Sequence, residues 1–305
     1  MDIFNQGGLA MPLVNMKPLL RHAMDNGYAV AAFNLVDYNS TKAMVKAAEG
    51  LNAPVICQTS SKTIDYYSHE EIVSCVRTCA ENSPVPVVLH LDHCKNLDMI
   101  EKCAAAGWTS IMIDASEFPF EENLAMSKQV REIAEKYNVG MEAELGQIMG
   151  VEDDMVVDEA DSVLTDPADA KTFCDALDLS AFACAVGTAH GYYKGDPVVG
   201  FDRIEAINKA TRTPMALHGG TGLSDETFAK AIARGAAKVN TSTNLKHVFI
   251  ESVDAYRKAK PNDYEPLRVI DAQYQACKAM FAGFIEKFGG KDQGSAFLAT
   301  LRENA

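Results

Sequence analysis

Three histidines of this sequence each follow a short apolar run, and together they could bind a metal ion. His93 ends "VVLHLDH", His190 ends "CAVGTAH", and His218 lies in "MALHGG". If these runs form strands of one parallel sheet or barrel, the three imidazoles meet at the edge where the strands end. Three imidazoles that leave a fourth position open are typical of a catalytic zinc site. We therefore predict that His93, His190 and His218 bind zinc.

The remaining histidines fit other positions. His22, His69 and His247 lie in helical or loop-like sequence and are expected on the surface. His90 lies within the third apolar run, so we expect it to have a structural role or to contact the groups around the metal.

The stretch "LHGGTGLSD" places three glycines within four residues of a histidine. Glycine packs nothing and costs conformational entropy, so a bare backbone here must allow a close approach. The backbone N–H groups of Gly219 and Gly220, the hydroxyl of Thr221 and a helix capped near Ser224 could bind a phosphate. A side chain at Gly220 should then block the phosphate. The neighbouring run "VNTST" adds side-chain donors: Asn240, Thr241, Ser242 and Thr243.

Polar residues also end most of the other apolar runs. Any one of them is easily explained as a hydrogen-bonded surface or core group, but a whole rim of them indicates an active site. These candidates are Asn34, Ser60, Asp92, Asp114 and Glu144.

Eight apolar runs alternate with amphipathic helical patterns, and several are apolar nearly throughout, as in strands covered on both faces. We predict an α/β fold, a (β/α)8 TIM barrel with a C-terminal helical extension. A doubly wound parallel sheet is the alternative, but no G-x-G-x-x-G follows the first strand. The predicted strands are residues 29–36, 54–60, 84–93, 110–116, 140–146, 181–187, 214–220 and 237–243.

We expect one domain over residues 1–305, with a helical tail at about 245–305 that is interrupted by "KPNDYEP". The stretch 147–172 is too long for a plain connection between a strand and a helix. Such insertions are often active-site loops.

The composition excludes several classes of partner. The formal net charge is −14, and no basic patch is apparent, so nucleic acid is not an expected ligand. No apolar run approaches the ~20 residues of a membrane span, and the first residues do not form a signal peptide. The eight cysteines show no C-x-x-C pair and are predicted to be free thiols, which favours a cytoplasmic location.

Seven motifs stand out along the chain: "HLDH", "MIDAS", "PFEEN", "EAELGQIMGVEDD", "VGTAHGYYKG", "LHGGTGLSD" and "KVNTST". Together they resemble the class II, zinc-dependent ketose-bisphosphate aldolases, which include the fructose- and tagatose-bisphosphate enzymes. The resemblance runs collinearly from about residue 10 to the "KPNDYEP" tail. It implies Zn²⁺ as cofactor, a phosphorylated sugar as substrate and a homodimer or homotetramer. We also consider a monovalent cation, Na⁺ or K⁺, as a further cofactor.

The resemblance assigns roles residue by residue. His93, His190 and His218 match the zinc ligands, and Asp114 and Glu144 match ligands of an alternate metal position. Asp92 matches the catalytic acid/base on the aldehyde-derived hydroxyl, and Glu152 the catalytic carboxylate that moves the proton at the ketose C3. The implied contacts of dihydroxyacetone phosphate are Gly191, Gly219, Gly220, Thr221, Asn240, Thr241, Ser242 and Thr243, with Asn34, Ser60 and Lys194 as further candidates.

The implied reaction is reversible cleavage of a ketose 1,6-bisphosphate to dihydroxyacetone phosphate and glyceraldehyde 3-phosphate. The sequence leaves fructose and tagatose bisphosphate open, because Ser242 replaces an aspartate that many fructose enzymes have. Two further functions stay open: an aldolase that acts on another phosphorylated ketose or a deoxy-sugar acid, and a catalytically silent accessory subunit. A metal-dependent hydrolase and a sugar-phosphate binding protein fit the motifs less well. An imine mechanism lacks its lysine at the end of the sixth strand, and Lys238 lies early in the eighth.

Overall fold

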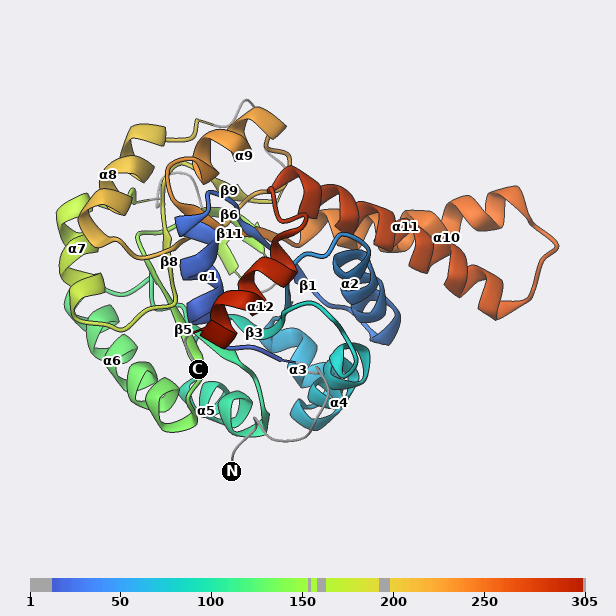
Figure 1. Ribbon diagram of the computed structural model, residues 1–305, viewed down its shortest axis with the longest axis horizontal. Helices are drawn as coiled ribbons and strands as arrows, with labels where there is room; N and C mark the ends of the chain where they lie inside the picture. Colours follow the sequence, from blue (N-terminus) through green and yellow to red (C-terminus); the bar gives the residue numbers. More distant parts are fainter. Residues whose placement is uncertain (1–12, 153–154, 158–162, 192–197, 304–305) are drawn as a thin grey trace.

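Eight parallel strands close into a barrel in the computed structural model, which describes residues 13–152, 155–157, 163–191 and 198–303 (Figure 1). Their order around the barrel is β1-β11-β10-β8-β5-β4-β3-β2. The predicted TIM barrel is therefore confirmed. The strands are β1 (Val30–Asn34), β2 (Val55–Thr59), β3 (Val87–Cys94), β4 (Ser110–Ile113), β5 (Gly140–Leu145), β8 (Ala181–Cys184), β10 (Met215–Leu217) and β11 (Ala236–Thr241).

Helices surround the barrel, as the sequence pattern predicted, and α1 lies across one of its ends (Figure 1). The stretch 147–172 was predicted as an insertion without a helix, but α7 begins within it, because Asp166 caps the helix and Pro167 occupies its first position. The helices before the tail are α1 (Met16–Asp25), α2 (Tyr38–Gly50), α3 (Ser61–Tyr67), α4 (His69–Ala80), α5 (Leu97–Ala106), α6 (Phe120–Tyr137), α7 (Pro167–Asp175), α8 (Phe201–Thr211) and α9 (Asp225–Ile232).

Every second residue of a barrel strand points inward, and these residues form two different layers. At the end covered by α1 they are apolar and mostly small, and they pack on α1 and on Phe297. This layer contains Val30, Ala32, Ile56, Val88, Met112, Ala181, Ala183 and Ala216. Farther along the same strands the interior is polar, with buried Gln58, His90, Asp92, Glu142, His218, Lys238 and Asn240. The interior polar layer lies toward the carboxyl ends of the strands, where such barrels carry their chemistry.

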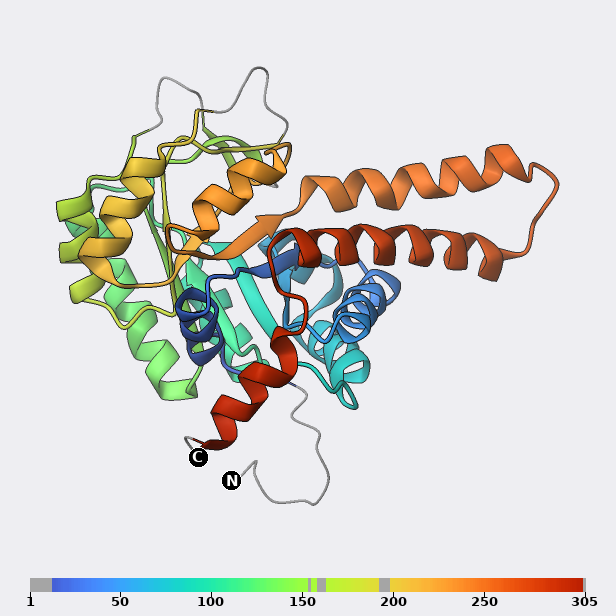
Figure 2. The same cartoon turned by 45° about the horizontal axis from the view of Figure 1, so that its top comes forward.

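The C-terminal extension is helical, as predicted. Helices α10 (Thr243–Ala259) and α11 (Pro266–Lys287) form a hairpin that projects from the barrel (Figure 2). The break between them coincides with "KPNDYEP". The second half of α11 returns to the barrel, where Phe281 packs on Phe33 with ring centroids 4.6 Å apart. Helix α12 (Gln293–Glu303) then adds Phe297 to the apolar end of the barrel interior.

The long stretch after β5 contains a second, smaller sheet. Strand β6 (Met149–Glu152) pairs antiparallel with β7 (Met155–Val157) and parallel with β9 (Ala189–His190). This part of the chain was predicted as a loop, and His190 was expected just past a barrel strand. The histidine does follow the barrel strand β8, and it also pairs in the small sheet as part of β9. In the described part of the chain, no helix is long and apolar enough to cross a membrane.

Candidate active site

A register shift in β3 turns two consecutive side chains toward the barrel axis. The pairing of β3 with β4 shifts between Leu91 and Cys94, and His93 has a φ of 44°, which non-glycine residues rarely adopt. Strict alternation would send Asp92 inward and His93 outward. The bulge lets both reach the site, and such local strain is common where a side chain is aimed for function.

The three predicted metal ligands come together. One ring nitrogen from each of His93, His190 and His218 lies within 4.8 Å of the others. His93 Nε2 and His218 Nδ1 are 2.8 Å apart. A second group, made of His93, Asp114 and Glu144, also has its ligand atoms within 4.8 Å of one another. His93 belongs to both groups.

In His93 and His218, the ring nitrogen that points away from the other histidine, called the outer nitrogen below, faces a carboxylate. His93 Nδ1 lies 2.9 Å from Asp114 Oδ2, and His218 Nε2 lies 2.8 Å from Glu142 Oε1. Since a carboxylate accepts, both outer nitrogens carry the hydrogen. Two lone pairs then face each other across 2.8 Å, which is repulsive unless a proton or a cation lies beside them. The site therefore fits a zinc ion, whose histidine ligands usually donate their other N–H to a carboxylate.

The carboxyls around His93 add to the demand for a cation. Burial lowers the pKa of His93, but Asp92 and the hydrogen bond from His93 to Asp114 outweigh it and hold that pKa well above its usual range. Burial raises the pKa of Asp114, but that hydrogen bond, the His93 charge and Ser116 hold it well below its usual range. Burial raises the pKa of Glu144 well above its usual range, and the Asp114 charge adds to this. Glu144 Oε2 also lies 4.0 Å from His93 Nδ1.

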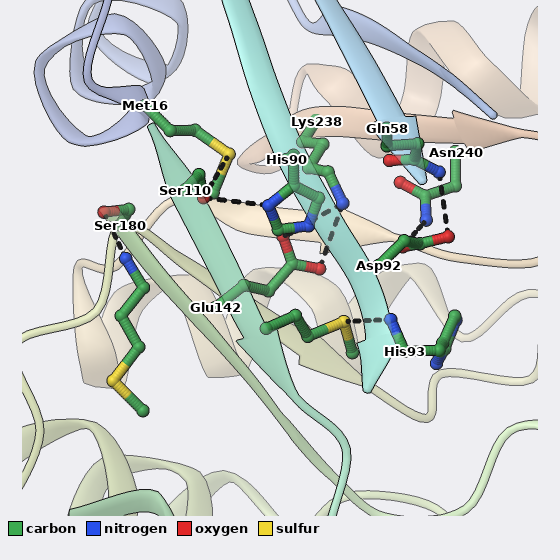
Figure 3. A network of polar contacts seen from close by, with 12 residues as sticks. Met16, Gln58, His90, Asp92, His93, Ser110, Glu142, Ser180, Lys238 and Asn240 are labelled. Atoms are coloured by element: carbon green, nitrogen blue, oxygen red, sulfur yellow. Dashed lines mark hydrogen bonds and ion pairs between the residues drawn. The ribbon is translucent and has the colours of Figure 1, made fainter. Parts of the chain in front are cut away.

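Asp92 is held by three side-chain amides. Asn34 Nδ2 donates to its Oδ2 at 3.1 Å. Gln58 Nε2 donates to Oδ2 at 3.0 Å, and Asn240 Nδ2 donates to Oδ1 at 3.0 Å (Figure 3). Gln58 also donates to Asn34 Oδ1 at 2.8 Å. The sequence analysis missed Gln58. Alternation along β2, counted from the inward Ile56, could have placed it inside the barrel.

The glycines of "LHGGTGLSD" serve the packing of the protein itself. Gly219 has a φ of +70°, and a Cβ there would lie 2.6 Å from the Ala189 carbonyl oxygen. Gly150 approaches the backbone of His190 in the same way, at 2.3 Å. Strand β9 is thus pressed between two glycines. A Cβ on Gly220 would meet the Asn240 carbonyl oxygen at 2.9 Å, so a side chain there would disturb the packing of the protein itself, and the predicted block of a phosphate stays a prediction.

Other predicted phosphate contacts lie at the ends of β10 and β11. Thr221, Asn240, Thr241 and Ser242 are buried, and Gly191 directly follows His190. In the described part of the chain, three buried hydroxyls have no hydrogen-bond partner in the protein, so each needs a water molecule or a polar ligand. They belong to Thr188, Thr241 and Ser242. Thr243 was expected in the last strand but is the first residue of α10, because Ser242 occupies the N-cap position.

The remaining predicted site residues are Asn34, Ser60, Glu152 and Lys194, and the structure describes them to different extents. Asn34 and Ser60 line a cavity of about 630 Å³ that opens beside Ser242, together with Lys62, Tyr66, Tyr67 and Lys246. Glu152 is the last residue of β6, and its side chain lies outside what the structure describes. Lys194 lies outside the described residues.

A buried charged network lies behind His218. Lys238 Nζ is 2.9 Å from Glu142 Oε2 and 3.1 Å from Oε1, and both side chains are fully buried (Figure 3). His90 Nδ1 contacts Ser110 Oγ at 2.8 Å, which agrees with the structural role predicted for His90. Burial, and then Lys238, lower the pKa of His90 well below its usual range. The sequence analysis did not single out Glu142, although it lies two residues before the predicted Glu144.

The description of the matching family model is "Fructose-bisphosphate aldolase class-II", and the match covers residues 14–293. The chain belongs to this family. It is 37% identical over 286 residues to the "Probable fructose-bisphosphate aldolase" of Bacillus subtilis, covering 93% of this chain and all of the relative. It is 39% identical over 285 residues to the fructose-bisphosphate aldolase of Staphylococcus aureus, covering 92% of this chain and 98% of the relative.

Solved structures agree with this family assignment. The YdjI aldolase from Escherichia coli has a TM-score of 0.81 and 27% identity, over 92% of this chain and 99% of that chain. A putative fructose-1,6-bisphosphate aldolase from Coccidioides immitis also has a TM-score of 0.81, with 28% identity over 90% of this chain and 96% of that chain. The resemblance seen in the sequence motifs is confirmed, and the chain is a lyase of the aldolase type.

Proposed function

We propose that this aldolase cleaves a ketose 1,6-bisphosphate, fructose or tagatose 1,6-bisphosphate, to dihydroxyacetone phosphate and glyceraldehyde 3-phosphate, and that it uses zinc. The single observation that supports this best is the meeting of two unlike groups at one point. Three imidazoles that fit a metal lie beside Asp92, a carboxylate whose oxygens are oriented by amides.

His93, His190 and His218 would hold the zinc ion, and Asp114 with Glu144 would offer His93 an alternate position. Bound there, zinc supplies Lewis-acid stabilisation of the negative charge that develops at the substrate carbonyl during carbon–carbon cleavage. The metal route is further supported by Lys238, because a fully buried lysine paired with Glu142 is a poor candidate for imine formation. A monovalent cation, Na⁺ or K⁺, remains part of the proposal as a second cofactor.

Asp92 acts as the catalytic base in the cleavage direction. It removes the proton of the C4 hydroxyl, which lets the C3–C4 bond break and releases glyceraldehyde 3-phosphate. Asn34, Gln58 and Asn240 fix the orientation of its carboxylate. In the second half of the reaction, Glu152 returns a proton to C3 of dihydroxyacetone phosphate.

The phosphate that belongs to the dihydroxyacetone phosphate half of the ketose bisphosphate would bind near the ends of β10 and β11. The unpartnered hydroxyls of Thr241 and Ser242 support this, since a phosphate offers the oxygens that they lack. Binding energy from this remote group orients the reacting carbons. The other proposed phosphate contacts are Gly191, Gly219, Gly220, Thr221, Asn240 and Thr243, with Ser60 and Lys194 as further candidates.

Coupled assays of triose phosphate release from fructose and tagatose 1,6-bisphosphate test the proposal. We expect cleavage of at least one of them, loss of activity after chelation, and recovery with Zn²⁺. Borohydride added with substrate should not inactivate the enzyme. Full activity in metal-free protein, or cleavage of neither sugar, would refute the proposal.

We further propose one domain over the whole chain, a homodimer or homotetramer, and a cytoplasmic location. Exposed apolar side chains on the α10–α11 hairpin support self-association: Ile250 is 61% and Leu267 is 71% exposed. Light scattering of the purified protein tests the assembly, and cell fractionation tests the location.

A further inference from the structure

The buried pair of Glu142 and Lys238 (Figure 3) contacts the proposed metal ligand His218 through Glu142 and has no part in the proposed chemistry. All three side chains are fully buried. Burial of a charged pair is a weak source of stability, because desolvation offsets most of the Coulomb attraction. A role in setting the geometry of the site explains its presence better than a role in stability does.

The contacts of Glu142 determine which nitrogen of His218 carries the hydrogen. Glu142 Oε1 lies 2.8 Å from His218 Nε2, and an unprotonated carboxylate only accepts. Lys238 Nζ lies within 3.1 Å of both Glu142 oxygens, so its charge balances that of Glu142 and holds it in place. The competing group, Asn240 Nδ2, is 3.5 Å from His218 Nε2 and donates to Asp92 at 3.0 Å.

We infer that Glu142, fixed by Lys238, is a positioning residue that makes His218 present Nδ1 to the metal, whereas His93 presents Nε2. The inference rests on the proposed zinc site. It follows from the fact that the two carboxylates accept from different ring nitrogens. Asp114 accepts the Nδ1 hydrogen of His93, and Glu142 accepts the Nε2 hydrogen of His218. The two histidines therefore bind through opposite ring nitrogens.

The unaltered protein provides the first test. Labelled with ¹⁵N-histidine and loaded with ¹¹³Cd²⁺, it should show coupling of the metal to Nδ1 of His218 and to Nε2 of His93. Coupling of the metal to Nε2 of His218 overturns the inference. The measurement needs no substrate and no substitution, so it stands even if a variant fails to fold.

A pair of variants provides the second test. Glu142→Gln replaces the acceptor by an amide that can donate as easily as accept, so it no longer selects one tautomer. Zn²⁺ affinity, measured by competition with a fluorescent chelator, should fall by roughly 10–100-fold, as is typical when a partner that orients a metal ligand is lost. The matched control is Ser110→Ala, which alters the same buried network but removes only the contacts to His90 and Met16.

We expect Ser110→Ala to bind Zn²⁺ as tightly as the parent. Equal Zn²⁺ affinity in the two variants, whether unchanged or equally weakened, overturns the positioning role. A protein that shows the expected coupling pattern but cleaves no ketose bisphosphate contradicts only the proposed function. A protein that cleaves the sugar but couples through His218 Nε2 contradicts only this inference.

Discussion

The barrel wall and the small sheet hold their histidines in different ways. In the barrel, His93 and His218 are oriented through their side chains. Asp114, which holds His93, follows the adjacent strand β4, and Glu142, which holds His218, lies on β5, two strands from β10. In the small sheet, His190 is placed through its backbone, because β9 runs between Gly150 and Gly219. A site can thus combine ligands fixed by hydrogen bonds with a ligand fixed by close packing of the main chain, and the two should fail differently when altered.

The largest effect is expected on the barrel side, from His93→Ala. His93 belongs to both candidate metal groups, so its loss leaves neither complete. Metal affinity should fall by more than the ~100-fold that marks the upper range for losing a supporting partner, and cleavage should be lost. Metal analysis after dialysis checks this. Retention of one equivalent of Zn²⁺ would show that His93 is not a ligand.

A second barrel substitution, Asp92→Asn, separates metal binding from proton transfer. It should leave metal content unchanged and lower kcat by roughly 10²–10⁴, the usual contribution of a positioned acid or base. Cleavage by Asp92→Asn at the parent rate would mean that another group is the base.

Glu152→Ala, in the small sheet, should slow proton exchange at C3 of dihydroxyacetone phosphate more than it weakens metal binding.

Gly219→Ala tests the packing of the small sheet. The new Cβ would lie 2.6 Å from the Ala189 carbonyl oxygen, so β9 and His190 must shift. Gly27→Ala is the matched control, because Gly27 has the same φ of +70° and no atom within 4 Å of the added Cβ. We expect the control to lose about 1–2 kcal/mol of unfolding free energy, and Gly219→Ala to lose about 1–3 kcal/mol more and to bind metal less tightly. Equal losses would argue against close packing as the reason for Gly219.

The smallest effect is expected from removing one of the three amides on Asp92. Gln58→Leu should lower kcat by roughly tenfold, since a hydrogen bond to a charged group is worth about 1.5–3 kcal/mol and two amides remain. Thr59→Val is the control: the next residue of β2 accepts a hydrogen bond from Trp108 outside the barrel interior. If both variants turn over at the parent rate, the amides do not orient the base.

Much of the barrel was predictable because buried parallel strands are apolar nearly throughout and alternate with helices. The small sheet was not, since β6, β7 and β9 are two to four residues long and carry no clear alternation. Helix α7 was missed although Asp166 and Pro167 form a recognisable start. In the site, Gln58, Glu142 and Lys238 could have been found by counting every second residue. The bulge that turns His93 inward could not have been predicted in this way, because a register shift depends on how β3 and β4 pair.

The closed end of the barrel limits how ligands can enter and leave the site. In the described structure, the apolar layer around Val88 and Met112 is packed beneath α1 and Phe297, so it offers no passage along the barrel axis. Substrate, products and metal must then share the opening at the opposite rim. A tightly bound substrate analogue should therefore block this opening, and Zn²⁺ should exchange more slowly in its presence than in its absence.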